Sequence, residues 1–291
     1  LGEKGAQPHI LVMSATPIPR TLALMIYGDL DVSVLDELPP GRQPIRTVHY
    51  TDAARLRLFG FMRQEIKKGR QIYVVYPLIK ESETMDYKDL QDGYEAISRN
   101  FPLPEYVTTI CHGKMKPEDK EESMRQFKSG EANIMVATSV IEVGVDVPNA
   151  TVMVIESAER FGLSQLHQLR GRVGRGSQQS YCILMSGEKL SKEARLRLEA
   201  MCETNDGFRL AELDLKLRGA GDVNGTLQSG MAFDLKIANP TLDSQILTVT
   251  REAAAEVLTA DPTLAQNGHE GLRELRKRYS GREEIDFSQI S

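Results

Sequence analysis

The spacing of hydrophobic residues predicts an alternation of β-strands and α-helices along most of the chain. Short, continuous apolar runs are typical of buried strands, whereas apolar residues at three- and four-residue steps are typical of amphipathic helices. The predicted strands are 10–14, 32–35, 45–50, 71–79, 106–111, 133–138, 151–155 and 180–185. The predicted helices are 20–27, 53–68, 117–128, 164–172, 189–202, 208–217, 242–259 and 270–279.

Turn residues divide this pattern into parts. Leu38-Pro39-Pro40-Gly41 interrupts all regular structure and is a candidate linker between two domains. After it, strands that are apolar throughout alternate with helices, which predicts a parallel sheet covered on both faces. Residues 42–187 are therefore expected to form one doubly wound α/β domain. The charged stretch 80–92 is expected to be a solvated surface insertion.

Composition narrows the classes of protein that fit. The 36 Lys and Arg are outnumbered by 41 Asp and Glu, giving a net charge of −5, so a uniformly basic nucleic-acid coat is excluded and a polyanion would need a local patch. No apolar run approaches the roughly 20 residues of a membrane span. The widely separated Cys111, Cys182 and Cys202 form no disulfide or metal-binding pattern and are typical of reduced thiols in the cytoplasm. The chain starts without Met and enters an apolar run almost at once, so we expect a piece of a longer protein.

The most informative string is QLHQLRGRVGRG at 165–176. From Arg160 to Gly176 there are four arginines and no acidic residue. Arg172 and Arg175 lie three apart, so on a helical turn they would point the same way, and the glycines before them would let a phosphate approach the backbone. Two guanidinium groups on one face match the charge of a γ-phosphoryl group in transfer. The alternative is a basic helix end that faces solvent or a carboxylate.

This string resembles the last motif of superfamily 2 helicases. Two other strings in the chain resemble further motifs of these helicases and agree with it in order and spacing. Ser14-Ala15-Thr16 resembles the coupling motif of that superfamily, and ATSVIEVGVDVP at 137–148 resembles the motif that precedes the arginines. Each motif is expected at a strand end, and the carboxyl ends of strands are where parallel sheets place ligands. More narrowly, 13–47, 156–176 and 217–230 resemble the RecG family of branch-migration helicases, and the resemblance runs from about residue 8 to about residue 236.

The resemblance implies a RecA-like doubly wound parallel sheet with a C-terminal helical hairpin and helices. It implies four parts: 1–41, the end of a first motor domain; 42–187, the second motor domain; 188–235, a helical hairpin with a Gly-rich translocation loop; and 236–291, C-terminal helices. ATP and Mg would be bound between the two motor domains. Gly113-Lys114 is followed by Met115, so it is no P-loop. The phosphate cradle and the Mg ligands are thus expected in a preceding half, and no metal ligand is assigned here.

The resemblance also implies roles for individual residues. Arg172 and Arg175 resemble arginine fingers, and Gln168 their companion near the γ-phosphate. Gly144 and Asp146 would lie near the ribose, although Asp146 could instead cap a turn before Pro148. The residues implied in DNA binding or coupling are Ser14, Thr16, His112, Gly113, Thr138, Arg218, Thr226 and Gln228. The alternative for His112 is a satisfied core histidine, and for the Gly-rich segment an ordinary surface loop.

The implied function is the C-terminal part of an ATP-dependent DNA helicase that remodels branched DNA in recombination and repair. Its substrates would be stalled forks and Holliday junctions. Its partners would be DNA, ATP, and the N-terminal wedge and first motor domain of the same protein, with no membrane. Two alternatives remain: the motor of a transcription–repair coupling translocase, and a RecA-like module that binds DNA or a partner without hydrolysing ATP.

Overall fold

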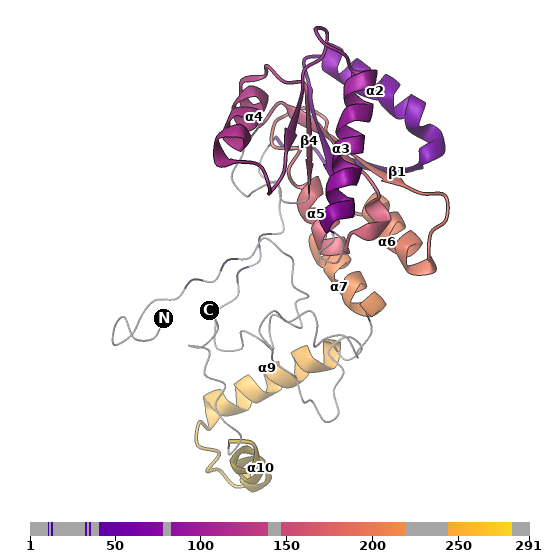
Figure 1. Cartoon of the computed structure of the whole chain (residues 1–291). Helices are drawn as coiled ribbons and strands as arrows, with labels where there is room; N and C mark the ends of the chain where they lie inside the picture. Colours follow the sequence, from indigo (N-terminus) through magenta and orange to yellow (C-terminus); the bar gives the residue numbers. More distant parts are fainter. Residues whose placement is uncertain are drawn as a thin grey trace. The chain divides into compact units, whose positions relative to one another are not determined.

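The computed structural model (Figure 1) describes residues 41–77, 83–138, 147–218 and 244–280, together with Leu11, Met13, Ser33 and Leu35. The described residues between 33 and 214 form one compact unit, and the helices after residue 243 belong to a second. Within these ranges, no helix is both long and apolar enough to span a bilayer. Most residues of the elements predicted before residue 41 lie outside the described ranges. Those that are described, in the predicted strands 10–14 and 32–35, are exposed and belong to no strand.

A six-stranded, fully parallel sheet forms the centre of the first unit, with the strand order β1-β6-β5-β2-β4-β3. This confirms the predicted parallel sheet, and the strand bounds lie close to those expected. The strands are β1 (Arg46–Thr51), β2 (Gln71–Tyr76), β3 (Thr108–Cys111), β4 (Ile134–Thr138), β5 (Ala150–Ile155) and β6 (Tyr181–Ser186). The central strands β4 and β5 are buried at every position, as strands covered on both faces must be.

One face of the sheet is covered by helices α2 (Arg55–Lys67) and α3 (Glu83–Asn100), which follow the short 3₁₀ helix η2 (Asp52–Ala54) and strand β2. Leu58, Phe59 and Met62 of α2 and Leu90 and Ile97 of α3 enter one hydrophobic core with alternate residues of the strands. Gly69, with a positive φ of 78°, follows α2 in the left-handed conformation in which many helices end.

Helix α3 corrects the sequence analysis. Residues 80–92 were expected to be a solvated insertion, but from Glu83 onward they belong to an 18-residue helix. Asp89 is exposed while Leu90 is buried, so charged and apolar residues share one amphipathic helix. A side chain at Gly93 would collide with the ring of Tyr76, so the helix reaches β2 closely only because this residue is glycine.

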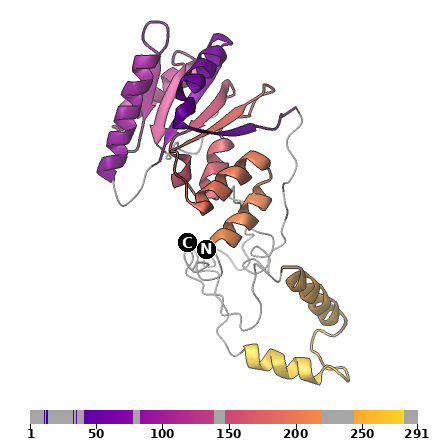
Figure 2. The same ribbon diagram turned by 90° about the vertical axis from the view of Figure 1, so that its right-hand side faces the viewer.

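The opposite face carries α4 (Pro117–Ser129), α5 (Leu163–Arg170) and α6 (Lys192–Glu203). The ring of Phe127 in α4 lies 4.8 Å from that of Tyr73 on β2, and α6 packs against β1 and α5. Helix α7 (Gly207–Arg218) follows α6 after a three-residue connection, and Figure 2 shows the two as successive orange helices. A 3₁₀ helix, η3 (Ala158–Arg160), lies between β5 and α5.

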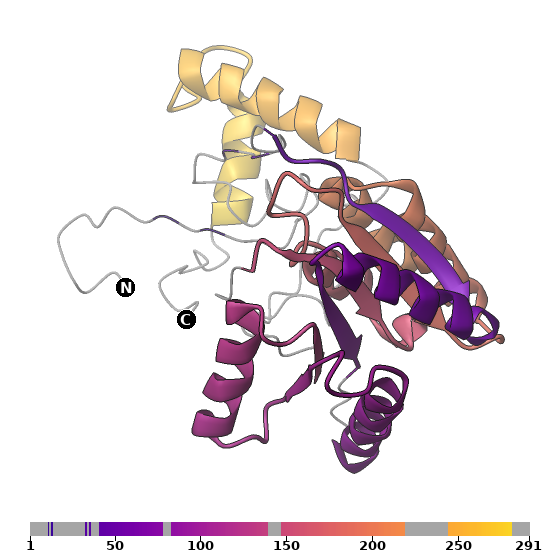
Figure 3. The same cartoon turned by 90° about the horizontal axis from the view of Figure 1, so that it is seen from above.

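In the second unit, α9 (Ser244–Ala260) and α10 (Glu270–Ser280) are drawn in yellow in Figure 3. The turn between them is organised by Asp261, whose Oδ1 accepts the amide of Ala265 at 3.0 Å and whose Oδ2 accepts that of Gln266 at 2.9 Å. His269 Nδ1 lies 2.9 Å from the same Oδ2. The predicted C-terminal helices are confirmed.

Candidate functional site

Helix α5 carries the arginine segment, which we define as residues 163–176. The amide of Gly162 donates to the side chain of Gln165 at 3.2 Å and so fixes the start of the helix. The helix ends at Arg170, two residues earlier than predicted. Arg172 and Arg175 therefore lie beyond it, so they do not share a helical face as predicted. Both side chains are half-buried, whereas Gln168 is exposed on the last turn.

The position of the arginine segment relative to the sheet also differs from the prediction. A Cβ on Gly174 would lie 2.9 Å from Cγ1 of Ile45, the residue before β1, and φ at Gly174 is 77°. A Cβ on Gly176 would lie 3.3 Å from the carbonyl oxygen of Pro148, shortly before β5. The segment after α5 thus lies near the beginnings of strands, not at their carboxyl ends as expected. At Gly174, packing against Ile45 explains the glycine without any phosphate.

Arg170 joins the arginine segment to α6. Its side chain is 2% exposed, yet its guanidinium has no carboxylate partner among the described residues. Nη1 donates to the main-chain carbonyls of Met201 at 2.9 Å and Thr204 at 2.8 Å, where α6 ends. A cation at this end of a helix is favourable because the last carbonyls lack partners within the helix. Burial lowers the pKa of Arg170, but a guanidinium stays charged near neutral pH.

The two helices joined at this point have well-defined ends. Ser191 Oγ accepts the amide of Ala194 at 3.1 Å at the start of α6. At the start of α7, Asp206 Oδ1 accepts the amide of Phe208 at 2.8 Å, while the amide of Asp206 donates to Thr204 Oγ1 at 3.0 Å. Thr204 thus bonds Arg170 through its carbonyl and the start of α7 through its hydroxyl. A displacement of α5 would therefore reach the connection between the two helices directly.

At the carboxyl edge of the sheet, the structure brings together Thr138 and the His112-Gly113 pair. Cys111 pairs with Ala137, so His112 and Thr138 follow at the ends of adjacent strands. The Thr138 side chain is fully buried, and its hydroxyl has no hydrogen-bond partner among the described residues. His112 is half-buried and Gly113 is exposed. Burial, followed by the charge of Lys114, lowers the pKa of His112, so this imidazole is neutral near pH 7.

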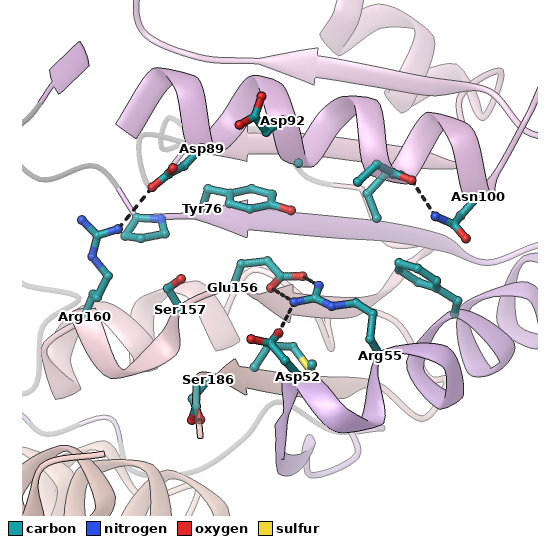
Figure 4. A pocket seen from close by; sticks show the side chains of 17 residues that line it. Asp52, Arg55, Tyr76, Asp89, Asp92, Asn100, Glu156, Ser157, Arg160 and Ser186 are labelled. Carbon is teal, nitrogen blue, oxygen red and sulfur yellow. Dashed lines mark hydrogen bonds and ion pairs between the residues drawn. The ribbon is translucent and has the colours of Figure 1, made fainter. Parts of the chain in front are cut away.

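A cavity of about 600 Å³ opens at the same edge on the face covered by α2 and α3. Figure 4 shows the Tyr76 ring between α3 and an ion pair formed by Arg55 and Glu156. Glu156 follows β5 and is 4% exposed; its Oε2 accepts Nη2 of Arg55 at 3.0 Å, and Oε1 accepts Nη1. Arg55 also pairs with Asp52, which lies outside the sheet in η2.

The charges of this cavity are arranged differently from those of the arginine segment. Burial raises the pKa of the Glu156 carboxyl above its ordinary value, although Arg55 opposes the shift. The second arginine of the lining, Arg160, pairs with Asp89 at 3.6 Å. A phosphate entering here would have to displace carboxylates from both arginines. The cavity is therefore a poor phosphate site. The arginine segment differs, because the side chain of Arg172 makes no hydrogen bond or ion pair within the described part of the chain.

Several predicted site residues cannot be placed. Ser14, Thr16, Gly144, Asp146, Thr226 and Gln228 lie outside the described residues, and Arg218 is the last residue of α7. In the described ranges, no group of three or more His, Cys, Asp or Glu side chains could hold a metal ion.

Sequence reasoning missed Arg170 and His167 as functional candidates. A usable signal was present: Arg170 falls four residues after Leu166 and seven after Leu163, on the buried stripe of the helix. An arginine on a buried stripe requires fixed acceptors. The acceptors themselves could not be found in this way, because they lie more than thirty residues away in the sequence.

Two family models match the chain. The model of the C-terminal part of domain 3 of the ATP-dependent DNA helicase RecG matches residues 204–291, which include α7, α9 and α10. The model of the helicase conserved C-terminal domain matches residues 55–177, from the start of α2 to just past the arginine segment. Together they match parts of both units of the structure.

Individual relatives agree with these models. The chain is 50% identical over 277 residues to the ATP-dependent DNA helicase RecG of Synechocystis sp., a match that covers 95% of this chain and 33% of the relative. It is 47% identical to the RecG of Aquifex aeolicus, covering 98% of this chain and 36% of the relative. A solved structure of RecG bound to a three-way DNA junction superposes with a TM-score of 0.62 at 45% identity, covering 81% of this chain and 30% of that one. The chain spans about a third of the length of these relatives.

Proposed function

Because the chain belongs to the RecG helicase family, we propose that it supplies the second RecA-like motor domain and the helical hairpin of an ATP-dependent DNA helicase acting on branched DNA. The substrates would be stalled forks and Holliday junctions, in recombination and repair in the cytoplasm. The first motor domain and the wedge of the same protein would be its intramolecular partners, and the first motor domain would hold the P-loop and the Mg ligands.

The observation that carries this proposal is the Arg170 junction. Arg170 lies two residues before Arg172, and it bonds the carbonyls at the end of α6. A change in the arginine segment on nucleotide binding would thus act on the α6–α7 hairpin through fixed hydrogen bonds. Motor proteins need such a connection between the nucleotide site and the element that moves on DNA.

The arginine segment fits a triphosphate. Arg172 is half-buried and has no acidic partner in the described part of the chain, so it can face phosphate oxygens. We propose that Arg172 and Arg175 stabilise charge at the γ-phosphoryl group and that Gln168 orients the attacking water beside them. Gly144 and Asp146 would bind the ribose. ATP, when bound, supplies the phosphoryl bond whose hydrolysis drives the motor.

We further propose that the carboxyl edge of the sheet binds the DNA backbone. The exposed backbone at Gly113 and the neutral ring of His112 would contact phosphate oxygens without reading base sequence. The hydroxyl of Thr138 is fully buried, so it would reach a phosphate only when its surroundings move on DNA binding. Ser14 and Thr16 would couple nucleotide state to this edge. Arg218, Thr226 and Gln228 would form the part of the hairpin and its loop that moves along DNA.

The family favours this function over the two alternatives. A transcription–repair coupling translocase would need a polymerase-binding module in the rest of the protein. A module that binds without hydrolysing ATP would have no use for arginines at a γ-phosphate. An ATPase measurement on the full protein tests the second alternative, and a test of binding to RNA polymerase addresses the first.

The test is Arg175→Ala in the full-length protein that contains this chain. Because arginine fingers contribute mainly to the transition state, kcat for ATP hydrolysis should fall by roughly 10³-fold with a much smaller change in nucleotide affinity. Arg99→Ala, an exposed arginine on α3 that bonds only its own helix, is the matched control. A kcat within about threefold of wild type would remove Arg175 from the nucleotide site.

A further inference from the structure

The two terminal nitrogens of Arg170 have different partners. Nη1 donates to the carbonyls of Met201 and Thr204 and lies 3.4 Å from Thr47 Oγ1 on β1. Nη2 has one acceptor within the described residues, the Nδ1 atom of His167, at 3.0 Å. His167 precedes Arg170 by three residues on the same face of α5. The ring therefore fixes the side of the guanidinium that does not contact α6.

This contact requires one protonation state of His167. A guanidinium has only donors, so Nδ1 can accept from Arg170 only when it carries a lone pair. The ring must then be neutral, with its proton on Nε2. Protonation at Nδ1 would place two N–H groups against each other and bring a second positive charge next to a buried one.

We propose that His167 is a positioning residue that, in its neutral form, orients Arg170 toward the end of α6, so that protonation of His167 weakens the connection between the arginine segment and the helical hairpin. This inference rests on the proposed function, because its consequence is a loss of coupling between ATP hydrolysis and DNA unwinding. Arg172 and Arg175 are not touched by the contact.

The surroundings keep His167 neutral at physiological pH. Burial is the main cause that lowers its pKa below 6.5, and the neighbouring charge of Arg170 adds to it. Asp206, in the α6–α7 connection, acts in the opposite direction. Cys182 of β6 and Cys202 of α6 lie near Arg170; burial raises the pKa of Cys182 to about 12 and that of Cys202 above its ordinary value, so both thiols are uncharged. Because folding lowers the pKa of His167, the contact is complete above pH 6.5 and is lost as the pH falls through the lowered pKa of the folded protein.

The experiment measures DNA unwound per ATP hydrolysed by the full-length protein on a forked duplex, at about pH 8 and about pH 5. The wild-type ratio should fall by about threefold or more at the lower pH, within the range for coupling between sites. His167→Asn keeps an acceptor near the Nδ1 position and cannot be protonated, so its ratio should stay constant. His167→Leu has no acceptor, so its ratio should be low at both pH values. His49→Gln, which replaces another histidine of lowered pKa on β1, should behave as wild type.

A pH response in His167→Asn equal to that of wild type, or a normal ratio in His167→Leu, would overturn the inference. The ¹⁵N chemical shifts of the His167 ring in the full-length protein provide a second measurement, independent of activity. A proton on Nε2 near pH 8 supports the contact, and a proton on Nδ1 overturns it. If the wild-type protein hydrolysed no ATP, the proposed function would fail, while the ring shifts would still decide the position of the proton.

Discussion

Two arginines in this domain, the half-buried Arg55 and the buried Arg170, are held by different chemistry. Arg55, beside the cavity, is paired with the carboxylates of Glu156 and Asp52, whereas Arg170, at the junction of α5 and α6, bonds main-chain carbonyls and a neutral imidazole. In the first case both partners carry charge, and removal of one leaves the other charge buried. In the second, the acceptors are neutral, and the cation offsets the unpaired carbonyls of a helix end. The first arrangement fixes side chains, whereas the second fixes the relative positions of two backbone segments.

The largest stability effect should come from breaking the ion pair. Arg55→Leu leaves the carboxylate of Glu156 buried without its partner, and the free energy of unfolding should fall by about 3 kcal/mol. Urea denaturation of the full-length protein measures it. Combining Arg55→Leu with Glu156→Leu should restore much of the loss, since no charge is then left unpaired. Arg57→Leu, an exposed neighbour lying over the Tyr50 ring, is the matched control and should cost less than about 1 kcal/mol. A double variant as unstable as the single one would contradict this reasoning.

Arg170→Met should lower the free energy of unfolding less than Arg55→Leu does. It should weaken the coupling of ATP hydrolysis to DNA unwinding more. Removing the guanidinium leaves the carbonyls of Met201 and Thr204 without a donor, which should lower the free energy of unfolding by about 2 kcal/mol. Because these carbonyls join α5 to α6, unwinding per ATP should drop further than ATP hydrolysis itself. Arg55→Leu should lower both activities in proportion to the protein that remains folded. If Arg170→Met and Arg55→Leu unwound the same amount of DNA per ATP hydrolysed, the contact of Arg170 with the end of α6 would not transmit movement.

The smallest effect on stability is expected at the turn between α9 and α10. Here the Asp261 carboxylate accepts hydrogen bonds from main-chain amides, whereas the Arg170 guanidinium donates to main-chain carbonyls. The amides of Gln266 and Ala265, together with His269, hold the pKa of Asp261 at about 2. Since folding lowers this pKa, the contribution to stability is complete above the ordinary value of 3.8 and is lost as the pH falls toward 2. The carboxyl ¹³C shift of Asp261 and the amide shifts of Ala265 and Gln266 should titrate together. His269→Gln should shift this titration only slightly upward, because backbone donors remain.

The sheet and most helices could be predicted because their signal is local. The apolar runs of β4 and β5 and the Pro and Gly at the ends of α4 specify these elements from neighbouring residues alone. Helix α3 was missed because Asp89 and Asp92 face solvent and Gly93 lowers the helical signal, while its core contacts through Leu90 and Ile97 depend on residues elsewhere in the chain.

The candidate site was predictable in its chemistry but not in its placement. The sequence of the arginine segment predicts candidate phosphate-binding residues, yet the end of α5 at Arg170 and the packing of Gly174 on Ile45 decide where those residues lie. The contact between Arg170 and Thr204 depends on how α6 packs on β1, which no spacing within the segment encodes.

Tyr76 of β2 lies so close to Gly93 of α3 that the side chains tolerated at these two positions depend on each other. A methyl group at position 93 would collide with the end of the Tyr76 ring, so a larger residue there requires the ring to shift or to be replaced by a smaller side chain. In an alignment of relatives, a residue larger than glycine at 93 should therefore occur mainly together with a smaller residue at 76. Such a pair of substitutions would reshape the wall of the cavity and leave the Arg55–Glu156 pair in place.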